Sequence, residues 1–494
     1  MILCGIDLGT QSCKVALYDS EKHEIVAKAQ EAVALISEND GTREQKAEWY
    51  DAALEKCFAA LDGGLKAQIK GIGVSGHQHS LVPLDAEGKA LYNVKMWNDT
   101  ATLAECAELT AAMGGEEALI AEQGLPMRPG YTAPKVLWLK NHKPEAFNKL
   151  AHILLSHDYI NYLLTGNYVA EYGDGSGTAL FDVRKRVWAK RTCDTIGPNV
   201  FAALPELHSS EQPAGKVSAK AAARFGIPEG ALVAAGGGDN MMAAIGTGTV
   251  ANGALTMSLG TSGTLYGYSD KPVIDPTGGV SAFCSSTGGW LPLHCSNNCT
   301  VASENFRALF GLDVRAFDAE AEKAPAGSEG VIILPYFDGE RNPNLPHGKA
   351  SLMGMNSANF NKANIARAAL ESAIFGLRFG LESFQRLGFQ PASLNLTGGG
   401  AKSKIWQRIA ANVMKLPVIV PDATEAAAMG GAIQALWTLQ KQEGRAESIE
   451  ALTKEHIKVD EGAAIKPDAA ESAIYDNAYA EFIKYLDAVK PMYL

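Results

Sequence analysis

The chain has 494 residues, of which 47% are hydrophobic and 20% are charged, and its net charge is −11 at pH 7. This length is too great for one hydrophobic core and predicts two domains of about 200–250 residues each. Charges of both signs are spread along the chain without a long basic run, so nucleic acid and anionic membranes are not expected as partners. There is no signal-peptide pattern, no apolar stretch of about 18 residues and no CxxC pair among the eight cysteines, so we expect a cytoplasmic protein with free thiols.

The first hundred residues predict a layered α/β domain that begins with a strand, a tight turn and a second strand. The turn is Asp7-Leu8-Gly9-Thr10, and it lies between two short apolar runs. A later buried strand ends in the polar sequence Gly76-His77-Gln78-His79. The expected strands are 2–6, 14–18, 24–33, 69–75 and 81–84, and a helix with one apolar face is expected at 48–61.

The middle of the chain, residues 100–230, is expected to be mainly helical, with loops at 124–132 and 171–177. A short strand at 231–235 then leads into Gly236-Gly237-Gly238-Asp239-Asn240, and a helix is expected to follow.

The second half opens with a near-repeat of the first. Leu259-Gly260-Thr261 matches Leu8-Gly9-Thr10, and Ser258 takes the place of Asp7. This weak symmetry predicts two related domains with a boundary near residue 248. The second domain is expected to contain strands at 255–259, 264–268, 331–334 and 393–396, helices at 364–387, 403–414 and 426–439, and polar surface helices in its last fifty residues.

Three glycine turns are suited to phosphate groups. In Asp7 to Thr10, backbone amides can face a phosphate and the carboxylate can hold Mg²⁺, directly or through water. Gly260-Thr261-Ser262-Gly263 offers hydroxyls and free amides, and Thr397 to Ser403 places a triple glycine before a helix N-terminus. The last turn is not a Walker A loop, because Ala401 precedes Lys402. Each turn alone could be an ordinary hairpin or glycine turn, and their pairing favours phosphate binding.

Two polar sequences that follow buried strands are suited to a sugar. The carboxylate of Asp239 can accept the proton of an attacking hydroxyl, and Asn240 can hydrogen-bond a polyol. The alternative for Asp239 is the N-cap of the following helix. His77, Gln78 and His79 are hydrogen-bonding side chains that suit a ligand with many hydroxyls, and the alternative is a surface loop without function.

Taken together, these motifs resemble the FGGY family of carbohydrate kinases, and within it the members that act on xylulose. The resemblance covers nearly the whole chain, from Ile2 to about Leu439. The sequences that carry it are Gly5-Ile6-Asp7-Leu8-Gly9-Thr10, Ser75-Gly76-His77-Gln78-His79, Met96-Trp97-Asn98-Asp99, Gly173-Asp174-Gly175-Ser176-Gly177, Gly237-Gly238-Asp239-Asn240, Leu259-Gly260-Thr261-Ser262, Leu334-Pro335-Tyr336 with Gly339-Glu340-Arg341, and Thr397-Gly398-Gly399-Gly400.

The resemblance implies an α/β fold of two ribonuclease-H-like domains, as in the actin-like ATPases, with a catalytic cleft between a sugar-binding domain (1–248) and a nucleotide-binding domain (249–494). It implies ATP-dependent phosphorylation of D-xylulose to D-xylulose 5-phosphate with Mg²⁺ as cofactor. Asp239 would be the general base, and Asp7 would assist the phosphates and hold Mg²⁺ through water. The sugar site would consist of Gln78, His79, Asp239 and Asn240, and the ATP site of Gly9, Thr10, Gly260, Thr261, Gly399, Gly400 and Ser403.

Two positions depart from the family pattern. Members that act on xylulose usually have Gln-Met-His or Gln-Gln-His before a glycine, where this chain has His77-Gln78-His79-Ser80, and some bacterial members have an arginine in the place of Ala101. A different sugar or polyol, such as L-xylulose, ribulose or a gluconate-like acid, therefore stays open. The alternative outside enzymes is an actin-like ATP-switched binding protein, which would not need Asp239. A homodimer is expected on general grounds only, because dimers are the commonest assembly of soluble proteins.

Overall fold

The computed structural model of the protein describes residues 1–421, 425–445, 447–458 and 461–493. The chain folds into two compact units that each contain a mixed β-sheet. In the described ranges, the first unit comprises 1–251, 269–291, 425–445 and 447–457, and the second comprises 252–268, 292–421, 458 and 461–493. No helix in these described ranges is both long enough and apolar enough to cross a membrane.

The main sheet of the first unit has the strand order β14-β15-β6-β1-β2-β3, and β16 also pairs with β6. Strand β1 is antiparallel to β2 and parallel to β6, so the chain forms a hairpin and then crosses over to its other side. The strands are β1 (Ile2–Leu8), β2 (Ser12–Asp19), β3 (Glu24–Ala32), β6 (Ile69–Gly76), β14 (Pro213–Lys216), β15 (Leu232–Ala234) and β16 (Gly237–Gly238). The strands expected from the apolar runs of the first domain are therefore confirmed.

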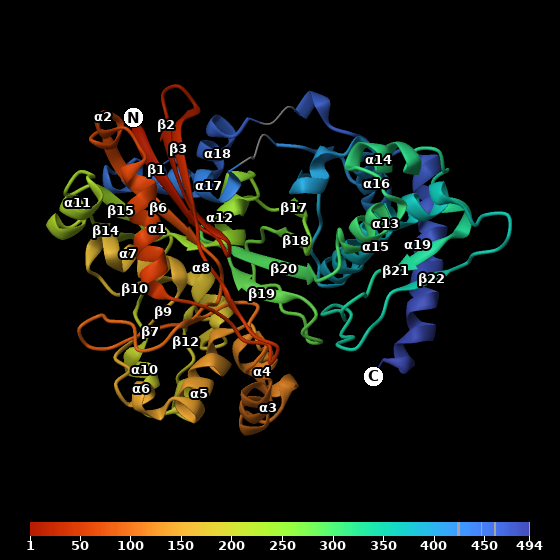
Figure 1. The fold of residues 1–494 in the computed structure, drawn as a ribbon. Helices are drawn as coiled ribbons and strands as arrows, with labels where there is room; N and C mark the ends of the chain where they lie inside the picture. Colours follow the sequence, from red (N-terminus) through yellow and green to blue (C-terminus); the bar gives the residue numbers. More distant parts are fainter. Residues whose placement is uncertain (422–424, 446, 459–460, 494) are drawn as a thin grey trace. The chain divides into compact units, whose positions relative to one another are not determined.

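Helices α1 (Ala47–Ala59) and α17 (Ala426–Gln442) cover the two faces of this sheet (Figure 1). Alternate side chains of β1 enter one apolar core with α1, and the residues between them face α17. On that second face, Gly5 and Gly73 permit very close approach, because a Cβ on either would overlap the backbone of Ala428 or Gly431. The small-residue helix expected at 426–439 thus belongs to the first unit and packs directly on its sheet.

The rest of the first unit is a largely helical region with short strands. The loop expected at 171–177 is instead two helical turns, since the Glu171 carboxylate accepts the amides of Gly173 and Asp174. The elements are β4 (Ile36–Ser37), β5 (Arg43–Gln45), α2 (Gly63–Lys66), β7 (Val82–Leu84), β8 (Val94–Lys95), α3 (Leu103–Ala112), α4 (Glu116–Gln123), α5 (Thr132–His142), α6 (Pro144–Asn148), β9 (His152–Leu154), α7 (Ser156–Thr165), β10 (Val169–Glu171), α8 (Tyr172–Gly175), η1 (Ser176–Thr178), β11 (Phe181–Asp182), β12 (Val187–Trp188), α9 (Lys190–Ile196), α10 (Val200–Ala203), β13 (Glu206–His208), α11 (Ala219–Phe225), α12 (Asp239–Gly246), β19 (Ser281–Cys284) and α18 (Ile449–His456).

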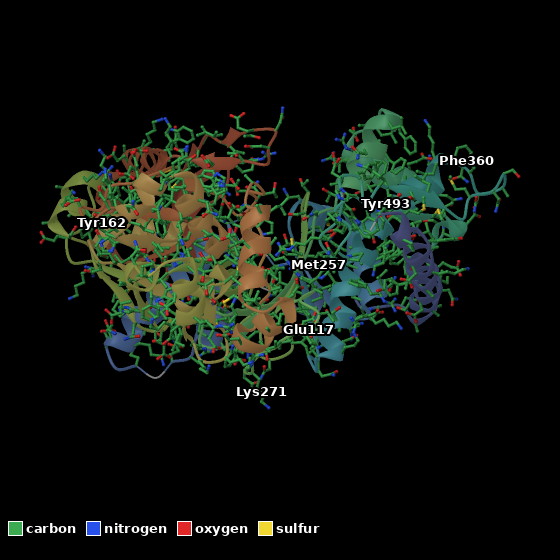
Figure 2. All side chains as sticks on the ribbon, turned by 90° about the horizontal axis from the view of Figure 1, so that it is seen from below. Glu117, Tyr162, Met257, Lys271, Phe360 and Tyr493 are labelled. Carbon is green, nitrogen blue, oxygen red and sulfur yellow. The ribbon has the colours of Figure 1, made fainter. Side chains whose placement is uncertain are left out.

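The second unit repeats the plan of the first sheet. Its strand order β20-β18-β17-β23-β24 again has an antiparallel hairpin, β17 with β18, and a parallel partner, β23, on the other side. Met257 on β17, labelled in Figure 2, is fully buried in this unit. Its elements are β17 (Ala254–Leu259), β18 (Gly263–Gly267), β20 (Trp290–Ser296), α13 (Val301–Phe310), α14 (Val314–Ala321), η2 (Ser328–Gly330), β21 (Ile332–Leu334), β22 (Ser351–Met353), α15 (Lys362–Arg386), β23 (Ser393–Thr397), η3 (Gly399–Lys402), α16 (Lys404–Met414), β24 (Val418–Ile419), η4 (Glu461–Ala463), α19 (Ala469–Val489) and η5 (Lys490–Met492).

The expectation of polar surface helices at the end of the chain is wrong for α19. This helix buries Tyr475, Tyr479 and Phe482, and all three rings contact Phe375 of α15. The aromatic side chains recur every three or four residues and so lie on one face of the helix, among the polar residues that suggested a surface position. Helix α19 is therefore part of the core of the second unit.

Candidate active site

Three parallel strands of the first unit end side by side and bring the predicted catalytic sequences to one edge of the sheet. Asp7 of β1 lies beside Ser75 of β6, and Ser75 lies beside Gly237 of β16. The residues that follow β6 and β16 are the polar sequence ending at His79 and the carboxylate of Asp239. The sheet therefore collects side chains that are more than 200 positions apart in the sequence.

Asp7 is held at the end of β1 by a hydrogen bond from Ser75 Oγ to its Oδ1 over 2.9 Å. Burial raises the pKa of the Asp7 carboxyl, while the Ser75 hydrogen bond and the charge of Lys14 act in the opposite direction. In the turn that follows, the amide of Gly9 donates to the carbonyl of Ser12, and Thr10 Oγ1 accepts a hydrogen bond from Trp97 Nε1 over 3.0 Å. The predicted turn is confirmed, and a carboxylate stands at its start.

Asp239 is the first residue of α12, and its carboxylate is only partly exposed. The N-cap position belongs to Gly238, so the interpretation of Asp239 as an N-cap is wrong. Its Oδ1 accepts the backbone amide of Asn240 over 2.7 Å and Asn240 Nδ2 over 2.9 Å. Burial and, to a smaller extent, the negative charge of Asp7 together raise the pKa of Asp239 to about 7, in spite of these hydrogen bonds. A carboxyl with this pKa can take up and release a proton near neutral pH.

The polar sequence after β6 is buried, so its interpretation as a surface loop is wrong. Gln78 is 6% exposed and His79 is 8% exposed. Gln78 Oε1 accepts a hydrogen bond from Asn240 Nδ2 over 2.8 Å, which links this loop to the start of α12. The His79 ring contacts Tyr131 and Phe283, with both pairs of ring centroids 5.2 Å apart. Asp239, Asn240 and Gln78 therefore form one hydrogen-bonded group within the first unit.

The remaining predicted residues form a separate group in the second unit, at the equivalent edge of its sheet. Strands β17 and β23 are parallel, with Ser258 beside Thr397, so the turns that begin at Gly260 and Gly398 follow neighbouring strand ends. Gly398 has φ = 84°, and a Cβ there would lie 2.5 Å from the carbonyl oxygen of Leu259. The structure thus brings together Gly260, Thr261, Gly399, Gly400 and Ser403.

Ser403 is the N-cap of α16, where its hydroxyl accepts the backbone amide of Trp406 over 3.4 Å. The Gly260 turn is supported from the loop after β20. The amides of Cys299 and Thr300 donate to the carbonyls of Thr261 and Gly260 over 3.0 and 3.1 Å. Both turns are therefore held by backbone hydrogen bonds. Gly399 itself faces open space, since a Cβ there would meet nothing within 4 Å.

Mg²⁺ fits this site only as an ion held mainly by water and phosphate. Within residues 1–421, 425–445, 447–458 and 461–493, no three histidine, cysteine or acidic side chains are grouped as ligands for a metal. The first unit does offer Asp7 and Asp239, two carboxyls whose pKa values are raised by burial, with the charge of Asp7 acting on Asp239. Magnesium in phosphoryl-transfer sites commonly uses one or two carboxylates together with waters and substrate phosphates.

Three residues around His79 were not found from the sequence. The backbone amide of His79 donates to Asp174 Oδ1 over 3.2 Å, and its carbonyl accepts hydrogen bonds from Thr132 Oγ1 and Lys135 Nζ. Asp174 lies in a sequence that carried the family resemblance, although no role followed from it. Lys135 is flanked by apolar residues in α5, which is the one local sign that its side chain is buried.

Comparison with known proteins agrees with the architecture. The duplicated sheets have the actin-like ATPase fold, which is also the fold of the solved xylulose kinase from Rhodospirillum rubrum, with a TM-score of 0.89 and 26% identity over all of both chains. The model of the N-terminal domain of FGGY carbohydrate kinases matches residues 2–246, and that of their C-terminal domain matches 241–439. The chain belongs to the FGGY family of carbohydrate kinases, and it is therefore a phosphotransferase that acts on a sugar or polyol.

Two curated relatives are similar over nearly their whole length. The chain is 41% identical to the xylulose kinase of Haemophilus influenzae over 98% of this chain and 99% of that protein. It is 34% identical to the xylulose kinase of Streptomyces coelicolor over 90% of this chain and 89% of that protein.

Proposed function

We propose that this carbohydrate kinase transfers the γ-phosphoryl group of ATP to the terminal hydroxyl of D-xylulose and produces D-xylulose 5-phosphate and ADP. The observation that supports the chemistry best is the partly buried Asp239, whose pKa is raised to about 7, hydrogen-bonded to Asn240 in a group that includes Gln78. The choice of sugar is supported by the identity to two xylulose kinases.

In this proposal Asp239 is the general base. Its carboxylate accepts the proton of the sugar hydroxyl while the hydroxyl oxygen forms a bond to the γ-phosphorus and the bond from that phosphorus to ADP breaks. The backbone amide and the side-chain Nδ2 of Asn240 both donate to Oδ1 of Asp239, and these two hydrogen bonds hold the carboxylate in place for the proton transfer. Alignment of the hydroxyl with the phosphorus provides much of the rate enhancement in such reactions.

Gln78, His79 and Asn240 are proposed to bind the other hydroxyls and the carbonyl of the sugar. All are side chains that can accept and donate hydrogen bonds, and they lie at the same strand ends as Asp239. The departure from the family pattern at His77 and Ser80 does not change the set of residues proposed to bind the sugar. His77 is fully buried, and its two ring nitrogens lie 2.7 Å from Ser80 Oγ and 3.1 Å from the Tyr50 hydroxyl. His77 and Ser80 therefore hydrogen-bond each other within the protein, and their departure from the family pattern adds no group to the proposed sugar site.

ATP is proposed to bind through backbone amides of the glycine turns. Gly260, Thr261, Gly399 and Gly400 follow neighbouring strand ends of the second unit, and Ser403 caps the helix that follows. Gly9 and Thr10 would contribute the corresponding turn of the first unit. Asp7 would hold Mg²⁺ through water, and the bound ion would neutralise charge on the phosphates.

A panel of substrates tests this proposal. ADP release is measured with D-xylulose, L-xylulose, D-ribulose, gluconate and glycerol, each over a range of concentrations. We expect the highest kcat/KM with D-xylulose, and a product with phosphate on O5 by phosphorus NMR. A higher kcat/KM with another member of the panel would contradict the proposed sugar, and an absence of sugar-dependent ADP release would contradict the proposed reaction.

We also propose that the enzyme works in the cytoplasm as a homodimer. All eight cysteines are free thiols, and seven of them are buried, as is usual in a reducing compartment. Light scattering of the purified protein tests the dimer, and a single species with the 52.3 kDa mass of one chain would contradict it.

A further inference from the structure

His79 has a backbone conformation that is uncommon for residues other than glycine. Its φ is 60°, in the left-handed region where side chains other than glycine are seldom found. Such a conformation persists when the surrounding structure fixes it, and it often occurs at binding sites. The contacts that fix His79 therefore decide where its imidazole is placed.

Both polar atoms of the His79 backbone are held by buried side chains of the first unit. The amide donates to Asp174 Oδ1, and the carbonyl accepts Thr132 Oγ1 over 3.0 Å and Lys135 Nζ over 2.8 Å. Thr132 and Lys135 belong to the N-terminal turn of α5, which is therefore hydrogen-bonded to the loop that follows β6. Lys135 Nζ also donates to the carbonyl of Gly130 over 2.7 Å, which ties the loop before α5 into the same contact.

The ring of His79 has little room to settle elsewhere. A Cβ on Gly177 would overlap the imidazole, so the chain passes directly against the ring at this point. Tyr131 and Phe283 pack against it, and the Asp174 carboxylate lies 3.5 Å from Nδ1. A displacement of the backbone would therefore move the imidazole as a whole, because rotation of the side chain cannot compensate for it.

The burial of Lys135 is costly and needs a reason. Its side chain is 0% exposed, and its Nζ donates to two backbone carbonyls. Burial, offset in part by the charges of Asp99 and Asp174, lowers the pKa of Lys135 to about 7. A methionine would fill the same space without the desolvation penalty, so packing alone does not account for a lysine at this position.

We propose that Lys135, together with Thr132, is a positioning residue for sugar recognition, because it holds the His79 carbonyl and so fixes the imidazole that contacts the ketose. This inference rests on the proposed function, in which His79 binds the sugar. Lys135 itself touches neither substrate in this account, and its effect reaches the sugar through the backbone of His79.

The matched pair Lys135→Met and Lys140→Met tests the proposal by steady-state kinetics. Lys140 lies on the same helix and also donates to a backbone carbonyl, that of Ile196, over 2.5 Å. We expect Lys135→Met to raise KM for D-xylulose about tenfold, which corresponds to the loss of roughly one charged hydrogen bond, with KM for ATP unchanged. Lys140→Met should leave both constants within twofold of the wild type. An unchanged KM for D-xylulose in folded Lys135→Met would overturn the proposal.

Thr132→Val provides the test if Lys135→Met does not fold. This change keeps the size of the side chain and removes the hydroxyl that donates to His79. We expect it to raise KM for D-xylulose about threefold, which corresponds to a neutral hydrogen bond, with KM for ATP again unchanged. Equal increases in both constants would indicate general damage and would count against a positioning role.

Hydrogen exchange without any substrate separates this inference from the proposed function. In Lys135→Met, the peptide that contains residues 77–80 should exchange at least tenfold faster than in the wild type and in Lys140→Met. If exchange is faster in Lys135→Met but the wild-type enzyme does not phosphorylate D-xylulose, the proposed substrate is contradicted and the contact between Lys135 and the loop is supported. Unchanged exchange at 77–80 would refute the proposal that Lys135 holds this loop, whatever the kinetics show.

Discussion

Asn240 Nδ2 donates hydrogen bonds to both Gln78 Oε1, over 2.8 Å, and Asp239 Oδ1, over 2.9 Å. One amide group therefore connects the loop after β6 with the carboxylate at the start of α12. This contact joins two sequences that are 162 positions apart and that the sequence could only assign separately.

We predict that Asn240→Ala raises KM for the sugar and lowers kcat. Loss of the amide removes a sugar contact and frees the Asp239 carboxylate, and each lost hydrogen bond costs about 1 kcal/mol or more. Steady-state kinetics should show an increase in KM for D-xylulose of about tenfold, with KM for ATP unchanged. Asn305→Ala, at an exposed position on α13, is the control and should behave as the wild type.

Asp239→Asn is predicted to abolish sugar phosphorylation almost completely while ATP binding survives. An amide cannot accept the hydroxyl proton, and loss of a general base lowers the rate by about 10²–10⁴-fold. Turnover is measured by ADP release and ATP binding by calorimetry. Near-normal kcat in this variant would contradict the role assigned to Asp239.

The pH dependence of the wild type is expected to follow the same carboxyl. Because Asp239 must be ionised to act as a base, kcat/KM should rise with pH and level off above about 7, the pKa to which burial and the Asp7 charge raise it. A profile that is flat between pH 5.5 and 8 would mean that another group is the base.

Asp239→Asn should also stabilise the folded protein, and more at pH 8 than at pH 5. The folded-state pKa is raised from 3.8 to about 7, so the stability linked to the protonated carboxyl is present below pH 4 and is lost as the pH rises through 7. A rise of three pKa units corresponds to at most about 4 kcal/mol. Thermal unfolding of both proteins without Mg²⁺ measures the difference, and an equal gain at both pH values would contradict this account.

Glu340→Ala is predicted to raise KM for ATP without changing KM for the sugar. The Glu340 carboxylate accepts the amides of Asn297 and Asn298, just before the residues whose amides support the Gly260 turn. Loss of the carboxylate leaves these donors unsatisfied, at about 1–3 kcal/mol each, and loosens the turn. Glu304→Ala, which removes an exposed ion pair on α13, is the control. A larger effect on the sugar than on ATP would refute this prediction.

The fold could be predicted well from local signals. Apolar runs of five residues on either side of glycine turns predicted both hairpins, and the repeat of Leu8-Gly9-Thr10 at Leu259-Gly260-Thr261 predicted two related sheets. The sequence could not show which sheet α17 covers, because its small residues fit any close contact and its partners Gly5 and Gly73 are more than 350 positions away.

The site divides in the same way. Asp7, Asp239 and the turn glycines follow strands and carry turn chemistry, so their sequence context marks them, although their contacts with ligands stay predictions. Lys135 and Asp174 act through the backbone of His79, and such a contact depends on the three-dimensional path of a loop and leaves no periodic pattern. The burial of a charged side chain is likewise decided by tertiary structure.

The position of α17 limits how this protein can be made and divided. A fragment that ends near residue 248 would leave one face of the first sheet, including Gly5 and Gly73, without its cover. On the ribosome the first unit cannot be completed until residues up to 457 have emerged. One face of its sheet therefore stays uncovered while nearly the whole chain is synthesised. An isolated first domain would need residues 269–291 and the α17 segment supplied on the same chain or added as further pieces.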